Sequence, residues 1–386
     1  MDFTKIRVLV LDTAGRQVPT ILKELHDLGC HITTLNSSRL DIGYSSRYPD
    51  KKLLYPKVNS DKECLKAALD KEIPSGNYDV VMPMLEGATE LLWKNIDEYG
   101  KYVKIAAADY EGFVNANDKQ LTMKLCQENG ISCPRTKMDN ETMEEFLAEV
   151  SFPLALKPRV GSGSRGFHKV DNKERLFELI NSGAVKVEEY VIQQFISDAE
   201  VHRVSYTFID NDNNVKASMI AKSSRPYPLG VGTNSLFEST YDPKICDQAE
   251  RLLKLMNWHG YASVCFIESD HDHIPMVMEI NGRISASIKI SMLCGINVVR
   301  MMIERAYGEP VTEYSRNVPE NIRIRHSQAN DMWFLKSPTR FSARPSFFNR
   351  RNTYDVVFSW KDPLPYLTYS MQCLEKYKTE MKKRER

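Results

Sequence analysis

Basic and small residues gather in one stretch of the chain, from Pro153 to Val170. A short apolar run ends in Lys157, and a loop of small residues around Arg165 follows it. The small residues of this loop are Gly161, Ser162, Gly163, Ser164 and Gly166. Glycine and serine leave backbone N–H groups accessible, and such groups next to lysine and arginine suit a polyphosphate. The stretch therefore predicts a phosphate-binding flap, with an ordinary Gly/Ser hairpin as the alternative.

Two other phosphate-binding motifs fit this stretch less well. The spacing Gly161-x-Gly163-x-x-Gly166 matches a dinucleotide-binding turn, but that turn opens a helix, whereas residues 167–170 read as a strand. A Walker A loop needs Lys and Ser/Thr after its last glycine, and here Phe167 follows Gly166. We therefore expect a hairpin that closes over a nucleotide.

A second set of candidate residues lies between Met276 and Arg283. Strand alternation places Glu279 and Asn281 on one face, with Arg283 just beyond the strand end. Hard oxygen ligands at this spacing next to an arginine suit Mg²⁺ and phosphate, because Mg²⁺ takes one or two protein oxygens and completes its shell with phosphate and water. The alternative is an ion pair between Glu279 and Arg283.

Other charged residues carry weaker signals. The run Asp270 to His273 resembles a metal cluster, but it stands where a polar turn is required, so we expect a solvated turn. Arg225, Arg323 and Arg325 are candidates for binding a second carboxylate. The basic tail from Lys376 is expected to be a solvated helix end.

The composition excludes several classes of protein. The 386 residues include 52 Lys and Arg against 51 Asp and Glu, a balance that gives no argument for nucleic acid or an anionic membrane as partner. The N-terminus lacks the long apolar core of a signal peptide, so a soluble cytoplasmic protein is expected. The 8 cysteines are scattered without a C-x-x-C pair, which indicates reduced thiols rather than disulfides or a zinc site.

The elements that must position these residues follow from the hydrophobic periodicity. Alternating strands and helices between Ile6 and Ala106 predict an open parallel α/β domain. Its first turn contains only Gly15, so we expect a substrate-side or structural domain rather than a nucleotide site. A helix capped by Asn117 or Asp118 places Lys119 in its first turn. Strands from Tyr190 onward predict a mostly antiparallel sheet.

Two later segments have no clear periodicity. Arg225 to Gly232 reads as a Pro/Gly loop that is too long for a simple hairpin, which favours a binding role. Residues 311–386 carry no chemistry that the sequence reveals, and we expect them to cap the site or to pack on the first domain.

Taken in order, these motifs resemble the ATP-grasp superfamily, and in particular one half of the carbamoyl-phosphate synthase large subunit and related carboxylate–amine ligases. The motifs are Lys119 in Asn-Asp-Lys, Lys157 before the hairpin, Gln193 to Ile196 followed by Glu200, and Glu279 to Arg283. The resemblance covers about residues 5 to 310. It implies an α/β domain (residues 1–110), two α+β lobes (111–190 and 191–310) and a C-terminal extension (311–386).

The resemblance also implies a role for each motif. Lys119, Lys157 and the flap should contact the phosphates of ATP, while Gln193, Gln194, Phe195 and Ile196 should hold adenine and Glu200 the ribose. Glu279 and Asn281 should bind Mg²⁺, with Mn²⁺ able to substitute, and Arg283 and Lys157 should act in catalysis. Two residues depart from the pattern. Cys265 stands where a metal ligand is usual, and a thiol binds Mg²⁺ poorly, so either Glu268 or water completes the second metal site or that ion is weakly held. Gln193 stands where an acidic residue is common.

The implied reaction is an ATP-dependent ligation of a small-molecule carboxylate with an amine through an acylphosphate, releasing ADP and phosphate. Attack of a carboxylate on the γ-phosphate brings anions together, so cations must neutralise the charge and no protein nucleophile is needed. The alternatives are an enzyme that phosphorylates bicarbonate, as carbamoyl-phosphate synthase does, and a regulatory ATP-binding protein that has lost its chemistry. We expect no nucleic-acid or membrane partner, and a homodimer stays open.

Overall fold

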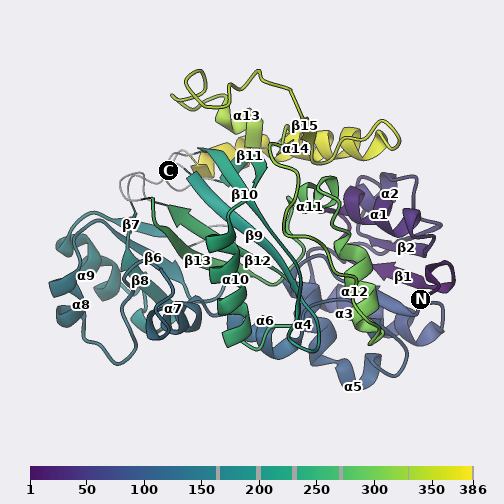
Figure 1. The fold of residues 1–386 in the computed structure, drawn as a ribbon, viewed down its shortest axis with the longest axis horizontal. Coiled ribbons are helices and arrows are strands. Elements are labelled where there is room, and N and C mark those ends of the chain that lie inside the picture. The colour runs from purple at the N-terminus through teal and green to yellow at the C-terminus, as the bar shows by residue number, and fades with distance from the viewer. Residues whose placement is uncertain (162–165, 197–200, 228–232, 269–272, 329, 385–386) are drawn as a thin grey trace.

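The computed structural model describes residues 1–386 except 162–165, 197–200, 228–232, 269–272, 329 and 385–386. Three sheets organise these residues (Figure 1). The first lies in the N-terminal part of the chain, the second in the part that contains Lys157, and the third in the middle of the molecule. The predicted arrangement of an open α/β domain followed by α+β lobes is confirmed.

The N-terminal sheet is parallel throughout, with strand order β3-β2-β1-β4-β5. Its strands are β1 (Arg7–Val10), β2 (His31–Asn36), β3 (Lys51–Leu54), β4 (Val80–Met82) and β5 (Lys104–Ile105). The connecting helices are α1 (Val18–Asp27), α2 (Ile42–Ser45), α3 (Lys62–Glu72), α4 (Glu86–Lys94) and α5 (Ile96–Tyr99). Strands β1 and β4 are almost wholly buried and apolar, as strands covered on both faces must be.

The second sheet has three antiparallel strands in the order β7-β6-β8. Its strands are β6 (Leu154–Pro158), β7 (His168–Val170) and β8 (Tyr190–Gln194), and its helices are α8 (Met143–Glu149) and α9 (Lys173–Asn181). Leu154 and Leu156 point into the core with Phe146 of α8 and Leu176 of α9. Because strand side chains alternate, Ala155 and Lys157 point to the opposite face. Helices α6 (Tyr110–Asn117) and α7 (Lys119–Glu128) lead into this part of the chain.

The third sheet has seven strands in the order β13-β12-β9-β10-β11-β14-β15, antiparallel except for the last pair. The strands are β9 (Val201–Ile209), β10 (Val215–Tyr227), β11 (Thr233–Thr240), β12 (Gly260–Glu268), β13 (Pro275–Asn281), β14 (Arg323–Arg325) and β15 (Thr353–Asp355). The accompanying helices are α10 (Pro243–Leu255), α11 (Lys289–Leu293), α12 (Val298–Ala306), α13 (Asn330–Phe334) and α14 (Leu364–Arg384).

One expectation for this sheet needs correction. Arg225 and Tyr227 belong to strand β10, which pairs with β11, so this part of the expected Pro/Gly loop is strand. Residues 228–232 of the expected loop lie outside the described residues. Periodicity missed the end of this strand because Pro226 interrupts its alternation and Arg225 has a positive φ of 62°.

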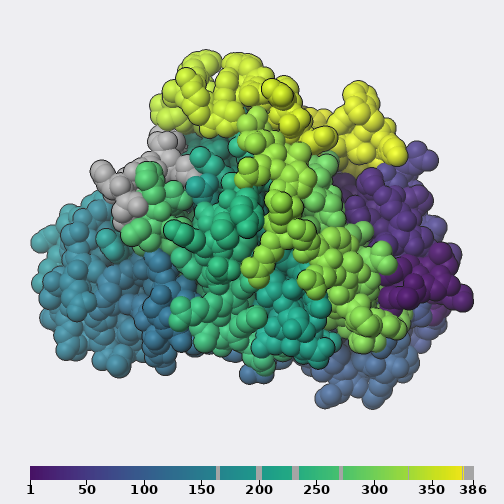
Figure 2. Space-filling model, in the orientation of Figure 1, coloured from purple at the N-terminus to yellow at the C-terminus, as the bar shows by residue number. Residues whose placement is uncertain are grey.

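The C-terminal segment, residues 311–386, joins the large sheet and also packs on the N-terminal domain. Its strands β14 and β15 extend the sheet beyond β11, and its helix α14 lies along one edge of the molecule beside α2 (Figures 1 and 2). Asp362, just before α14, accepts hydrogen bonds from Ser46 Oγ at 2.5 Å and from the Arg47 N–H at 3.1 Å. Sequence patterns did not predict these strands, because three-residue strands are too short to show alternation. The domain limits near residues 110, 190 and 310 stay a prediction.

The described residues of the chain contain no helix that is both long and apolar enough to span a membrane.

Candidate active site

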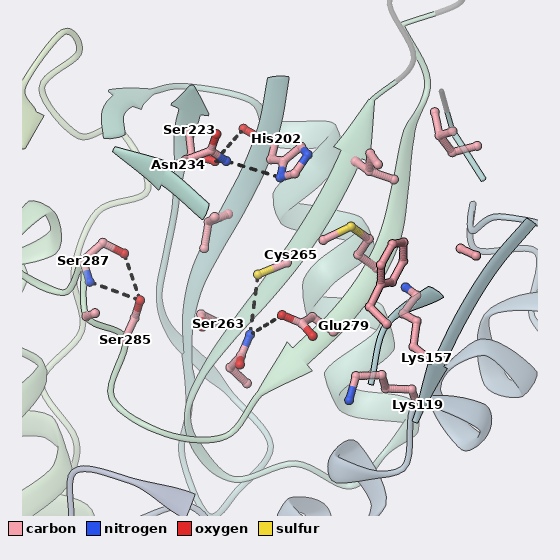
Figure 3. A pocket seen from close by; sticks show the side chains of 18 of the residues that line it. Lys119, Lys157, His202, Ser223, Asn234, Ser263, Cys265, Glu279, Ser285 and Ser287 are labelled. Carbon is pink, nitrogen blue, oxygen red and sulfur yellow. Dashed lines mark hydrogen bonds between the residues drawn. The ribbon is translucent and has the colours of Figure 1, made fainter. Parts of the chain in front are cut away.

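A cavity of about 360 Å³ lies between the three-stranded sheet and the seven-stranded sheet, and Figure 3 shows it from close by. Its wall contains most of the residues that the sequence singled out. They are Lys119, Lys157, Gly161, Gln193, Gln194, Phe195, Ile196, Glu279, Asn281 and Arg283. Segments more than 150 residues apart in sequence thus converge on one space, as the ordered set of motifs requires.

Lys157 and Lys119 form a cationic corner of this cavity (Figure 3). Lys157 projects from β6 on the face opposite its apolar neighbours, and Lys119 is the first residue of α7. Burial lowers the pKa of Lys157 to about 8; the carboxylate of Glu279 acts in the opposite direction, and Lys119 adds to the decrease. The lysine therefore carries a proton at neutral pH only at a desolvation cost, which a bound anion would remove.

The flap is only partly described. Lys119 Nζ donates to the carbonyl of Gly161 at 2.6 Å, so the lysine lies where the flap begins. Gly166 at the far end has a φ of 73°, and a Cβ there would lie 2.8 Å from Pro158. Glycine is therefore required at this turn. Ser162, Gly163, Ser164 and Arg165 lie outside the described residues, and Glu200, the expected ribose ligand, does too.

The predicted adenine side is formed by the end of β8. Gln193 is 2% exposed, and its amide donates to Thr136 Oγ1 at 3.2 Å. The N–H groups of Gln194 and Phe195 donate to the carbonyls of Arg135 and Pro153 at 2.8 and 3.2 Å. These bonds fix the backbone at the cavity wall, where Ile196 follows.

Glu279 and Asn281 lie side by side on β13, as strand alternation predicted. The Asn281 amide is 3.4 Å from Glu279 Oε1 and 3.6 Å from the sulfur of Cys265 on the neighbouring strand (Figure 3). The pairing of β12 with β13 shifts register between Cys265 and Phe266, which is a β-bulge. The bulge lets the consecutive residues Met278 and Glu279 both face the cavity, an arrangement that a regular strand forbids.

Glu279 and Asn281 would hold one Mg²⁺ ion if the Asn281 amide turned, because its NH2 group faces Glu279 and its Oδ1 accepts from Arg283 Nη2 at 3.4 Å. A carboxylate and an amide oxygen are hard ligands, and Mg²⁺ takes few protein ligands and keeps water and phosphate in its remaining positions. Burial raises the pKa of the Cys265 thiol well above its ordinary value, so the thiol is no ligand for this ion. Glu268, which the sequence offered as a substitute, pairs with Arg203 at 3.2 Å and does not line the cavity. Among the described residues, no group of three or more His, Cys, Asp or Glu forms a metal site.

Arg283 lines the cavity but pairs with a residue of the N-terminal domain. Its Nε donates to Glu86 Oε1 at 2.7 Å, at the first residue of α4. The ion pair with Glu279 that the sequence left open is therefore not formed. The structure instead couples the end of β13 to the N-terminal domain.

The three arginines proposed for a second carboxylate are engaged elsewhere. Arg225 donates to the carbonyls of Pro345 and Ser346, at 2.8 and 3.0 Å. Arg323 pairs with Glu238, and Arg325 pairs with the buried Asp331. None of the three lines the cavity. Sequence could not reveal this, because the carbonyls that bind Arg225 lie about 120 residues away.

The cavity is also lined by Arg16, His326 and Asn330, which the sequence motifs did not include. Arg16 Nη1 donates to His326 Nδ1 at 2.7 Å and to Asn330 Oδ1 at 3.3 Å. A signal for Arg16 existed, because it follows the first parallel strand, and ligands bind at the carboxyl ends of such strands. No comparable signal marked His326 or Asn330, which the short strand β14 and helix α13 bring to the cavity.

Gly282, between Asn281 and Arg283, is held in close contact by the core. A Cβ at this position would lie 2.5 Å from Trp258 and 3.1 Å from Phe113, and Trp258 is fully buried. We expect Gly282→Ala to lower the free energy of unfolding by about 1–3 kcal/mol, since overpacking forces side chains or backbone to shift. Urea denaturation measures this change. Gly87→Ala in α4, where a Cβ meets nothing within 4 Å, is the matched control and should be neutral or slightly stabilising. Equal stability of both variants would contradict the packing argument.

Comparisons with known proteins agree with this geometry. Residues 116–287 match the model of the ATP-grasp domain. The D-aspartate ligase of Enterococcus faecium (strain Aus0004) is 24% identical over 262 residues, which are 62% of this chain and 62% of that protein. The chain thus spans less than two thirds of this relative.

Solved structures share the fold at low sequence identity. The biotin carboxylase domain of Hydrogenobacter thermophilus 2-oxoglutarate carboxylase, solved with MgADP and bicarbonate, has a TM-score of 0.67 at 15% identity, covering 82% of this chain and 73% of that one. The L-amino acid ligase of Bacillus licheniformis has a TM-score of 0.62 at 18% identity, covering 82% and 78%. These likenesses show that the chain shares the fold of these proteins, and the family match identifies residues 116–287 as an ATP-grasp domain.

Proposed function

We propose that this protein is an ATP-dependent carboxylate–amine ligase that uses Mg²⁺ and releases ADP and phosphate. The observation that carries the proposal is the juxtaposition, in one cavity, of the Lys119–Lys157 corner with Glu279 and Asn281. Two lysines suit the charge of a triphosphate, and the two oxygen ligands suit the metal that accompanies it. The similarity to a D-aspartate ligase and an L-amino acid ligase supports the reaction class.

The residues of the chain account for the phosphoryl transfer as follows. Lys157 and Lys119 bind and neutralise the phosphates. Adenine lies against Gln193 to Ile196. Glu279 and Asn281 hold Mg²⁺, which supplies further charge neutralisation when it is bound. Arg283, fixed by Glu86, orients the substrate carboxylate that attacks the γ-phosphate.

The second half of the reaction needs protection from water rather than a protein nucleophile. The acylphosphate is an activated carboxyl group, and an amine forms the amide by displacing phosphate from it. Water would destroy the same intermediate, so the flap and the cavity walls must exclude it. The candidate residues therefore act by binding, orientation and exclusion of water.

Two other functions are weighed against this one. An enzyme that phosphorylates bicarbonate would use the same phosphate and metal residues, and biotin carboxylase domains share the fold. A regulatory ATP-binding protein would bind ATP without turning it over, and Cys265 at the usual position of a metal ligand motivates this alternative. ADP release in buffer free of bicarbonate separates the three functions. Release that depends on an added carboxylate indicates the ligase, release that requires bicarbonate indicates the second function, and no release under either condition indicates the third.

Transfer of an oxygen-18 label tests the acylphosphate directly. We expect a substrate carboxylate labelled with oxygen-18 to pass one labelled oxygen to the released phosphate, because the bridging oxygen leaves with phosphorus. Mass spectrometry of the phosphate measures this transfer. Labelled water with unlabelled substrate is the control, and it should leave the phosphate unlabelled during amide formation. Release of AMP and pyrophosphate would show that the carboxylate is adenylated instead.

A further inference from the structure

A connected set of polar side chains lies across the cavity from Lys119 and Lys157, and the proposed phosphoryl transfer does not use it. Figure 3 shows three of them, His202, Ser223 and Asn234, on neighbouring strands of the large sheet. The Asn234 amide donates to Ser223 Oγ at 2.9 Å and to His202 Nδ1 at 3.3 Å. Because His202 Nδ1 accepts, the proton of its neutral ring is on Nε2.

Arg16 belongs to the same set through the C-terminal segment. Asn330 donates to the backbone carbonyl of Asn234 at 2.8 Å and accepts from Arg16 at 3.3 Å. His326 Nδ1 accepts from Arg16 at 2.7 Å. The N-terminal domain, the large sheet and the C-terminal segment thus meet at this end of the cavity. We call Arg16, His202, Ser223, Asn234, His326 and Asn330 the distal set.

The charge of Arg16 is not neutralised by these contacts. Its hydrogen-bond partners His326 and Asn330 are both neutral, because burial and the nearby Arg16 charge lower the pKa of His326 well below its ordinary value. Arg283, the other arginine of the cavity wall, pairs with Glu86. Within the described part of the chain, Arg16 forms no ion pair. A guanidinium has five N–H donors, so most of them remain available to a ligand.

Two buried atoms of the distal set also lack a hydrogen-bond partner in the structure. They are His326 Nε2 and Asn234 Oδ1, on side chains that line the cavity and are 3% and 8% exposed. Because His326 Nδ1 accepts from Arg16, its Nε2 is a donor, whereas Asn234 Oδ1 is an acceptor. A buried polar atom without a partner destabilises the structure, and a ligand that pairs with it recovers this cost.

We propose that the distal set binds a second carboxylate of the substrate, so that the substrate of this enzyme is a dicarboxylic acid. This inference rests on the proposed function, in which the first carboxylate is phosphorylated near Glu279. The Arg16 guanidinium and the His326 Nε2–H donate to the second carboxylate. Asn234 Oδ1 accepts from a hydroxyl or amino group on the carbon next to it.

A purely structural role for Arg16 is the competing explanation, since it links two parts of the chain. The two roles differ in what they predict for substrates. A structural arginine affects stability and all substrates alike, whereas a ligand arginine discriminates a dicarboxylate from its monoester. Arg16→Gln keeps N–H donors for His326 and Asn330 and removes the charge.

The test measures ADP release with succinate, glutarate, malate and aspartate, each compared with its monomethyl ester, in the presence of a fixed pool of amines that accept the acyl group. We expect at least one dicarboxylate to support turnover, with kcat/KM about 10- to 100-fold above that of its ester, because a charged hydrogen bond contributes about 1.5–3 kcal/mol. Arg16→Gln should raise the KM for this dicarboxylate by a similar factor and leave the KM for ATP and the values for the ester unchanged. Equal use of diacid and ester by the wild type, or an equal effect of the variant on both, would overturn the proposal.

Asn330→Asp provides a second variant in case Arg16→Gln fails to fold. It places a carboxylate 3.3 Å from Arg16 with almost no change in volume, so it should abolish the preference for the diacid. Calorimetry with Mg²⁺ and a non-hydrolysable ATP analogue separates this proposal from the proposed function. If the wild type binds a dicarboxylate and the variants do not, but the wild type releases no ADP, the second-carboxylate site is retained and the ligase function is rejected. The absence of binding by every diacid in the panel would reject the site.

Discussion

Glu279→Gln should reduce turnover by about three orders of magnitude while the protein stays folded. The amide keeps the volume of the side chain but loses the negative charge that holds the metal, and metal stabilisation of phosphoryl transfer contributes several kcal/mol. Glu279 lies on the cavity side of β13, next to the bulge, and Lys157 is close enough for its pKa to respond to the Glu279 charge. Removing the carboxylate therefore affects the metal and the lysine together.

ADP release at saturating Mg²⁺ and ATP measures this loss, and circular dichroism verifies the fold. Glu268→Gln is the matched control, because it makes the same chemical change on the adjacent strand outside the cavity. The control should keep most of the activity. If both variants lost turnover equally while folded, Glu268 would be the missing metal ligand. Normal ADP release by Glu279→Gln would reject the metal site.

ATP affinity should depend on Lys157 and should fall as the pH rises. Burial lowers the pKa of this lysine to about 8, so between about pH 7 and pH 9 it loses the proton that attracts the triphosphate. ATP binds the protonated lysine more tightly than the neutral one. Binding therefore takes up a proton near pH 8, and the affinity for ATP falls above that pH. Lys157→Ala should weaken binding about 10- to 100-fold at neutral pH and remove this pH dependence.

Isothermal titration calorimetry with MgATP across this pH range makes the measurement, and Lys157→Arg and Lys186→Ala are the controls. Arginine keeps its charge throughout, so it should flatten the pH profile. Lys186 lies in the same lobe and pairs with Glu189 outside the cavity, so its removal should change nothing. Unchanged affinity in a folded Lys157→Ala protein would remove Lys157 from the phosphate site.

The local sequence was sufficient for the elements whose chemistry is contained in a few residues. Asp118 was one of two predicted caps, and it does cap α7 by accepting from the Gln120 N–H at 2.9 Å. Alternation of buried and exposed positions placed Glu279 and Asn281 on one face of β13, which the structure confirms. The open parallel N-terminal sheet followed from its repeating strands and helices. In each case the pattern that allowed the prediction lies within one turn, one strand or one strand–helix repeat.

The pairings between distant segments were decided by the tertiary structure. Arg225 reads as a residue of a binding loop, yet it lies in β10 and binds the carbonyls of residues 345 and 346. An ion pair of Arg283 with Glu279 was the alternative that the sequence left open, yet Arg283 pairs with Glu86, 197 residues away. An arginine has many acceptors within reach once the chain folds, and nothing in its local sequence selects among them.

The sequence by itself determined which residues are candidates for the phosphate and metal chemistry, because a lysine before a Gly-rich hairpin and a Glu-x-Asn strand are local patterns. Only the tertiary structure decided what surrounds them. It brought Arg16 from the first β–α turn against His326 and Asn330 from a segment without readable periodicity. The physical reason is that burial, and with it the charge balance and the unpartnered atoms of the distal set, arises only when the three sheets pack around one cavity.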